Sequence, residues 1–198
     1  MTQIKLCGMT RVIDIQAVNA LKPDYIGFVF WPKSKRCVTA EDAAELKSIL
    51  DPDIAAVGVF VDEEPSIVAD LLNRGIIDIA QLHGSEDESY ISRLRALSKK
   101  PVIQAFRIRE PKDLLPAAAS SAEGILLDAG KGEGMVFDWE LLRNFDRPYF
   151  LAGGLTPENV REAIERLHPY AVDVSSGIET NGVKNAEKMA AFVSAVRS

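Results

Sequence analysis

Short apolar runs alternate with stretches of helical periodicity along the whole chain. Each run is four to eight residues long and rich in Val, Ile, Leu or Phe, as is typical of strands buried on both faces. Eight runs predict eight strands, at residues 4–7, 25–30, 55–61, 78–84, 101–108, 124–129, 148–154 and 171–175.

The stretches between the runs predict helices. Between the last two strands Val160, Ala163, Ile164 and Leu167 follow the i, i+3, i+4, i+7 pattern of one helix face. A last helix places its apolar face at Met189, Phe192, Val193 and Val196. The segment 112–120 predicts only a weak helix, because Pro116 interrupts it.

Polar residues before these helices predict where they begin. Thr10 is expected to cap the first helix, and Thr39 with Asp42 resembles a capping box for the second. Ser85 with Glu88 gives the same pattern after the fourth strand. In the seventh unit, Thr156 and Pro157 predict a cap followed by proline at the first helical position.

This alternation predicts one domain over residues 1–198, a minimal (β/α)8 TIM barrel without insertions. A doubly wound open sheet is the alternative. Eight parallel strands are many for such a sheet, and no GxGxxG motif follows the first strand, so the barrel is favoured.

The composition of the chain indicates which kinds of binding partner and which cellular compartment are expected. With 23 Lys and Arg against 29 Asp and Glu, the net charge is −6, which argues against a nucleic-acid or anionic-membrane partner. We see no secretory signal and no apolar run of about 18 residues. Two cysteines without a CxxC pair, and two distant histidines, make a zinc site unlikely and favour a reduced, cytoplasmic setting.

In a barrel the carboxyl ends of all strands meet at one mouth, where ligands bind. The chemically competent residues of this chain fall at those ends: Cys7, the loop with Arg36, Asp128, Gly153 with Gly154, and Ser175, Ser176 and Gly177. Cys7 could instead be an apolar core residue, since free cysteines are usually buried.

The two Gly-containing turns follow strands seven and eight, where barrels commonly bind phosphate through backbone N–H groups. They could also be ordinary turns, but as neighbours they favour a phosphorylated substrate. A thiolate at Cys7 can act as a base and a buried Asp128 as an acid. One acid and one base, without a metal or a cofactor, suit isomerisation by proton transfer.

Seven motifs in order along the chain resemble the phosphoribosylanthranilate isomerase family of tryptophan biosynthesis. They are KLCGMTR (5–11), GFVFWPKSKR (27–36), QLHG (81–84), LLDA (126–129), GEGMVFDW (132–139), LAGGLTPENV (151–160) and VDVSSGIE (172–179). The resemblance implies an Amadori rearrangement of N-(5-phosphoribosyl)anthranilate to a 1-deoxyribulose 5-phosphate, the third step from chorismate, in a monomer or homodimer.

By the same resemblance Asp128 is the general acid that protonates the furanose oxygen, and Cys7 is the base that removes the C2 proton. Arg36 matches the position that holds the anthranilate carboxylate, and Gly153, Gly154, Ser175, Ser176 and Gly177 match the phosphate site. Roles for His83, Arg107 and Asp173 stay open between ligand contact and internal structure.

The chain departs from the family pattern in two places. Lys35 stands where the family usually has proline, which predicts a looser loop around Arg36. Gly132-Glu133-Gly134 replaces a GTG sequence, in a loop that looks shortened after Asp128. Two other functions stay open: an isomerase that also accepts the related aminoimidazole carboxamide, against which Cys7 argues, and a silent barrel that only binds ligands.

Overall fold

Eight parallel strands close into a barrel in the computed structural model, which describes residues 1–129, 139–143 and 145–198. The strands are β1 (Gln3–Cys7), β2 (Tyr25–Val29), β3 (Ala55–Phe60), β4 (Ile79–Leu82), β5 (Val102–Arg107), β6 (Gly124–Asp128), β7 (Tyr149–Ala152) and β8 (Ala171–Val174). They pair in sequence order, and β8 pairs with β1 to close the ring. The predicted minimal (β/α)8 barrel is confirmed, and the open sheet is wrong.

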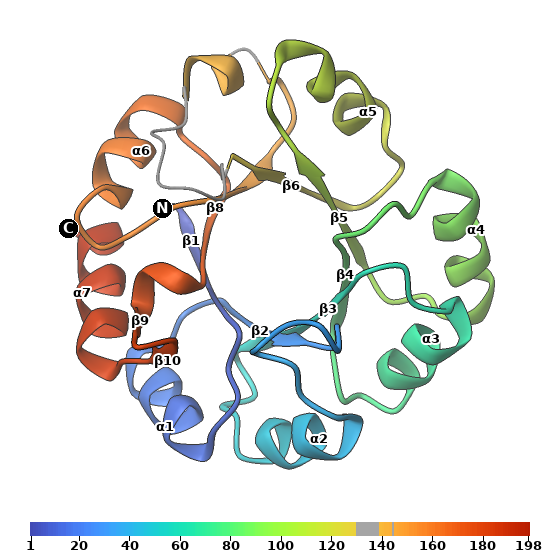
Figure 1. Ribbon diagram of the computed structural model, residues 1–198, viewed down its shortest axis with the longest axis horizontal. Coiled ribbons are helices and arrows are strands. Elements are labelled where there is room, and N and C mark those ends of the chain that lie inside the picture. The colour runs from blue at the N-terminus through green and yellow to red at the C-terminus, as the bar shows by residue number, and fades with distance from the viewer. Residues whose placement is uncertain (130–138, 144) are drawn as a thin grey trace.

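Helices surround the ring of strands (Figure 1). The α-helices are α1 (Val12–Leu21), α2 (Ala40–Ser48), α3 (Pro65–Asn73), α4 (Glu88–Leu97), α5 (Leu114–Ala119), α6 (Val160–Leu167) and α7 (Ala186–Arg197). Three 3-10 helices are η1 (Pro111–Asp113), η2 (Trp139–Leu142) and η3 (Ser176–Ile178), and a small antiparallel pair, β9 (Glu179–Thr180) and β10 (Val183–Lys184), precedes α7. The predicted helix at 112–120 is short, at six residues, but Pro116 does not interrupt it, because it lies in the first turn of α5, where an N–H group has no partner within the helix.

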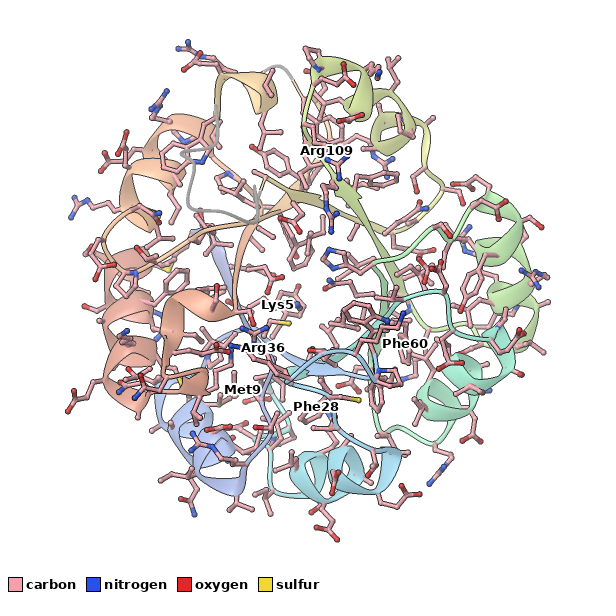
Figure 2. All side chains as sticks on the ribbon, in the orientation of Figure 1. Lys5, Met9, Phe28, Arg36, Phe60 and Arg109 are labelled. Carbon is pink, nitrogen blue, oxygen red and sulfur yellow. The ribbon has the colours of Figure 1, made fainter. Side chains whose placement is uncertain are left out.

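Successive strand residues point alternately out of and into the barrel, so the core has two parts. The larger part lies between strands and helices and includes Ile4, Leu6 and Phe28, the last of which faces outward from β2 (Figure 2). The smaller part fills the barrel itself, with Val57, Ile103, Leu126, Phe150, Ala152 and Ala171. The inward positions nearest the mouth are therefore the ones left for polar side chains.

The predicted helix starts are right in one case and wrong in three. Thr39 and Asp42 form the expected capping box of α2. At α1 the N-cap is Arg11, because the buried Asp14 carboxylate takes the N–H groups of Thr10 and Arg11.

The other two corrections concern α4 and α6. At α4 the N-cap is Asp87, which accepts from Tyr90 N, while Ser85 instead donates to Asp62. At the start of α6 Thr156 lies in a turn, and the regular helix begins at Val160.

Candidate active site

Cys7 lies at the carboxyl end of β1 with its side chain in the barrel, 7% exposed. Gly8, with a φ of +84°, turns the chain out of the strand there. Gly27 on the adjacent strand makes room for the sulfur, since a Cβ at that position would lie 2.5 Å from Cys7 Sγ. The thiol is therefore fixed by close backbone approach on the β2 side.

A buried ion pair lies below the thiol. Lys5, two residues earlier on the same face of β1, is fully buried, and its Nζ lies 3.0 Å from Asp173 Oδ1 on β8. Its side chain projects toward the middle of the barrel in Figure 2. Burial lowers the pKa of Lys5, but Asp173 and Cys7 outweigh burial and the net shift is upward, so the group stays an ammonium.

This ammonium acts directly on the thiol. Burial raises the pKa of Cys7 above its ordinary value, because a thiolate is poorly solvated there. The positive charges of Lys5 and Lys184 oppose that shift, whereas Asp173 adds to it. Two cations thus lie near the thiol, but burial has the larger effect on its pKa.

Asp128 ends β6 and faces the same mouth, with its side chain 21% exposed. Its Oδ2 lies 3.3 Å from His83 Nε2, and His83 Nδ1 lies 3.0 Å from Nε2 of the buried Gln81. The side chain of His83 therefore points into the mouth and contacts the carboxylate.

A cavity of about 480 Å³ lies beside His83, toward β4 and β5. Arg107 is among its lining residues and is paired in register with Asp128 across β5 and β6. The role of Arg107, as a ligand contact or in an internal ion pair, stays a prediction. Asp173, by contrast, has an internal role as the partner of Lys5.

Arg36 reaches the mouth from the loop after β2 and binds the carboxylate of Glu179 at two points. Its Nε lies 2.5 Å from Oε1 and its Nη2 lies 2.9 Å from Oε2. Lys184 Nζ is 2.7 Å from the same carboxylate, and the exposed Lys35 is 3.4 Å from it. Burial favours the neutral acid, but the hydrogen bonds from Arg36 and Lys184 outweigh it and lower the pKa of Glu179 to about 2.

Two turns complete the mouth next to this ion cluster. After β7, Gly153 and Gly154 have φ values of +96° and +68°, and after β8 the chain forms η3 at Ser176–Ile178. Within the described residues no hydrogen bond uses the backbone N–H of Gly154 or Gly177. These N–H groups are therefore available to a ligand.

Gly177 joins the two turns. A Cβ built on it would lie 1.9 Å from the carbonyl oxygen of Leu155, which is far inside contact distance. Ser175 anchors the other side, because its carbonyl and its hydroxyl both accept from Lys184 Nζ, at 2.9 and 3.2 Å. The predicted site residues of strands seven and eight therefore form one continuous surface.

We expect Gly177→Ala to lower the free energy of unfolding by about 3 kcal/mol, because the methyl group forces the two turns apart. Urea unfolding measures the change. The matched control is Gly75→Ala, where φ is +72° but nothing lies within 4 Å of the new Cβ. It is expected to lose only about 1–2 kcal/mol through backbone strain. Equal losses in the two variants would contradict the contact.

Sequence reasoning missed Lys5, Glu179 and Lys184. Lys5 carried a readable signal, because a charged residue at an inward position of a buried strand requires a partner. Glu179 ends the VDVSSGIE motif but was given no role there, and nothing in the local sequence marks Lys184. The predictions for Gly132, Glu133 and Gly134 lie outside the described residues.

Two features are absent from the described part of the chain: a metal-binding cluster and a membrane-spanning helix. Residues 1–129, 139–143 and 145–198 contain no group of three His, Cys, Asp or Glu side chains arranged to hold a metal ion. Among the same residues no helix is long and apolar enough to cross a membrane.

A closed parallel barrel whose strand ends bring together a thiol, a carboxylate and two Gly-rich turns defines a (β/α)8-barrel enzyme. A family model described as N-(5'-phosphoribosyl)anthranilate (PRA) isomerase matches residues 4–195. The chain belongs to this family.

Relatives agree over full length. The chain is 46% identical over 203 residues to N-(5'-phosphoribosyl)anthranilate isomerase of Endomicrobium trichonymphae, covering 100% of both. It superposes with a TM-score of 0.89 and 36% identity on a phosphoribosyl anthranilate isomerase in complex with reduced 1-(o-carboxyphenylamino)-1-deoxyribulose 5-phosphate, covering 100% of this chain and 99% of that one. It superposes with a TM-score of 0.88 on monomers generated from the dimeric Thermotoga maritima enzyme, with 36% identity, covering 100% of this chain and 99% of that one.

Proposed function

We propose that Cys7 and Asp128 carry out the isomerisation that defines the family. The reaction converts N-(5-phosphoribosyl)anthranilate to 1-(o-carboxyphenylamino)-1-deoxyribulose 5-phosphate in tryptophan biosynthesis. It opens the furanose ring at C1 and shifts a proton from C2, so it requires one acid and one base held at opposite ends of the reacting carbons.

Asp128 is the general acid. It donates a proton to the furanose ring oxygen, the bond from that oxygen to C1 breaks, and the nitrogen lone pair forms a Schiff base with C1. The position of Asp128 at the end of β6, partly exposed in the mouth and beside His83, supports this role. The product of the step is an open-chain cation above the thiol.

Cys7 is the general base. As thiolate it removes the C2 proton, the C–H electrons form the C1–C2 double bond of an enolamine, and the iminium charge is neutralised. Tautomerisation of the enolamine to the ketone completes the reaction. The ammonium of Lys5 beneath the thiol supports this role, because it stabilises the thiolate in a buried position.

The phosphate binds at Gly153, Gly154, Ser175, Ser176 and Gly177, and the anthranilate carboxylate binds Arg36. The unused N–H groups of Gly154 and Gly177 support the first assignment. For the second, Arg36 Nη1 makes no hydrogen bond within the described residues, while Nε and Nη2 are held by Glu179. Glu179 thus fixes the guanidinium and leaves one edge for the substrate.

The observation that carries the proposal is the convergence of Cys7 and Asp128 with both Gly-rich turns at one mouth. We would follow the loss of anthranilate fluorescence from freshly generated phosphoribosylanthranilate, comparing the wild type with Cys7→Ala. The matched control is Cys37→Ala, which removes the exposed thiol. Rapid loss with wild type and Cys37→Ala but not with Cys7→Ala is expected. If the wild type causes no loss of fluorescence above that of spontaneous hydrolysis, the hypothesis of a silent barrel that only binds ligands is favoured instead.

Arg36→Ala is expected to raise the Michaelis constant about 10- to 100-fold while kcat changes little, because a charge-assisted hydrogen bond to the substrate is lost. Steady-state kinetics measure both constants. Lys35→Ala is the matched control, since Lys35 touches the same Glu179 from an exposed position. An unchanged Michaelis constant in Arg36→Ala would place the carboxylate elsewhere.

The partner that this site accepts is a phosphorylated small molecule, with no nucleic acid. A monomer or a homodimer in the cytoplasm fits the chain best: the related Thermotoga maritima enzyme is dimeric, and both cysteines, Cys7 and Cys37, are free thiols.

A further inference from the structure

Asp128, the general acid of the proposed reaction, is connected to two further side chains, those of His83 and Gln81. We call these two side chains the relay. Gln81 points inward from β4, and His83, two residues further on, directly follows the end of that strand and points the same way. Gln81 Nε2 lies 3.0 Å from His83 Nδ1, and His83 Nε2 lies 3.3 Å from Asp128 Oδ2. Neither residue was given a role by the sequence beyond the open alternatives for His83.

The far end of the relay has an unusual feature. Gln81 is 1% exposed, and within the described residues its Oε1 has no hydrogen-bond partner. Buried amide groups normally have all their polar atoms bonded, so a half-bonded one calls for an explanation. Among the described residues the ring of His83 is the one partner of this amide, so within them the ring decides whether the amide presents nitrogen or oxygen.

Two proton arrangements satisfy the contacts between the three side chains. If Gln81 presents Nε2–H to Nδ1, the neutral ring has its proton on Nε2 and donates to an ionised Asp128. If Gln81 turns over and presents Oε1, Nδ1–H donates to it, and the bare Nε2 accepts from a protonated Asp128. The same geometry therefore serves the acid before and after it gives up its proton.

We propose that His83 is a positioning residue for Asp128 and that Gln81 matches the tautomer of His83 to the protonation state of that carboxyl group. The inference rests on the proposed function, in which Asp128 cycles between acid and carboxylate at each turnover. His83 also lines the cavity of about 480 Å³, through which its ring nitrogens exchange protons with solvent when the tautomer changes.

Other charges face the relay. Five charged residues on β5, on η1 and in the loops after β3 and β5 line the cavity that His83 borders: Asp62, Arg107, Arg109, Glu110 and Asp113. Asp62 is held by Ser85, and Asp113 by the backbone N–H groups of Arg109 and Glu110. Among the described residues, Gln81 is the side chain that is hydrogen-bonded to Nδ1 of His83.

Kinetics of two single variants and their double variant test the relay. His83→Asn is expected to lower kcat 10- to 100-fold, to change the Michaelis constant less than twofold, and to shift the limb of the kcat pH profile that reports Asp128. Gln81→Leu is expected to shift the same limb in the same direction with a smaller loss of kcat. Because the two act as one unit, the double variant should be no slower than His83→Asn. Multiplied losses, or an unmoved pH profile, would overturn the proposal.

Gln104→Leu is the matched control for loss of a buried glutamine. Gln104 is on the neighbouring strand but faces the helices, where it bonds Glu86 O and Ser120. Its variant is expected to unfold at lower urea concentration with the kcat pH profile of the wild type. A shifted profile in this control would assign the effect to loosened packing instead.

A second measurement does not depend on turnover, so it separates this proposal from the proposed function. The chain has two histidines, and His168→Asn leaves only His83 for ¹⁵N NMR of the ring nitrogens. One dominant neutral tautomer is expected, and Gln81→Leu should convert it to a mixture. Mixed tautomers in the presence of Gln81 would overturn the relay even in an active enzyme, and an inactive enzyme with a single tautomer would refute only the proposed reaction.

Discussion

Asp128→Asn is expected to fold and to bind ligand as the wild type does, while kcat falls by two or more orders of magnitude. The amide keeps the shape of the side chain and can still accept from His83 Nε2, so packing at the end of β6 changes little. It has no proton to give to the ring oxygen at neutral pH, and a positioned general acid contributes about 10²- to 10⁴-fold.

Three measurements on this variant decide the matter. Single-turnover kinetics give the chemical step, titration with the reduced product gives the affinity, and urea unfolding gives the stability. The matched control is Asp70→Asn on α3, where the carboxylate is 57% exposed and pairs with Arg74. A kcat within tenfold of the wild type in Asp128→Asn would remove this residue from the role of acid.

Lys5→Met is expected to lower both stability and activity, for different reasons. The variant leaves Asp173 charged and 8% exposed without its partner, and breaking a buried pair in this way costs about 3–5 kcal/mol. It also removes the cation that opposes the effect of burial on the thiol, so the pKa of Cys7 rises further and less thiolate is present at neutral pH.

The two effects separate in the double variant Lys5→Met with Asp173→Asn. Neutralising both partners removes the unpaired charge, so most of the lost stability should return in urea unfolding. The thiol still lacks its cation, so kcat should stay low. In a Cys37→Ala background, alkylation of Cys7 followed against pH should show its midpoint moved upward. Full recovery of kcat in the double variant would mean that Lys5 acts only on stability.

The sequence was most informative where structure depends on local pattern. Apolar runs placed all eight strands, because a strand between two layers needs nothing else to identify it. Barrel strands end at one mouth, so the positions of the strands were enough to predict that Cys7 and Asp128 lie at the same mouth, although more than a hundred residues separate them in the chain. The helix starts were less secure, because Asp14 binds the N–H groups of Thr10 and Arg11, and Asp87 rather than Ser85 accepts from the N–H group of Tyr90.

The polar contacts inside the barrel could not be predicted in the same way. The bond between Lys5 and Asp173 depends on the register of β1 against β8, which only barrel closure establishes. The cluster around Glu179 depends on a two-residue strand pair that folds Lys184 back over the mouth. The sequence predicts only that Gln81 lies in a strand. Its contact with His83, and through it with Asp128, is known only from the structure.

Closure of the ring by its first and last strands matters while the chain is being made. β1 is made before its partner β8, which lies some 170 residues further along the chain, so the growing sheet has an open edge until β8 has been made. An open apolar edge invites pairing with another chain, and a charge pointing inward from the edge strand discourages it. Lys5 is such a charge: any foreign strand that covered it would have to bury an ammonium without Asp173. The charge that opposes the effect of burial on Cys7 in the closed barrel is thus also expected to disfavour pairing of the unfinished sheet with another chain.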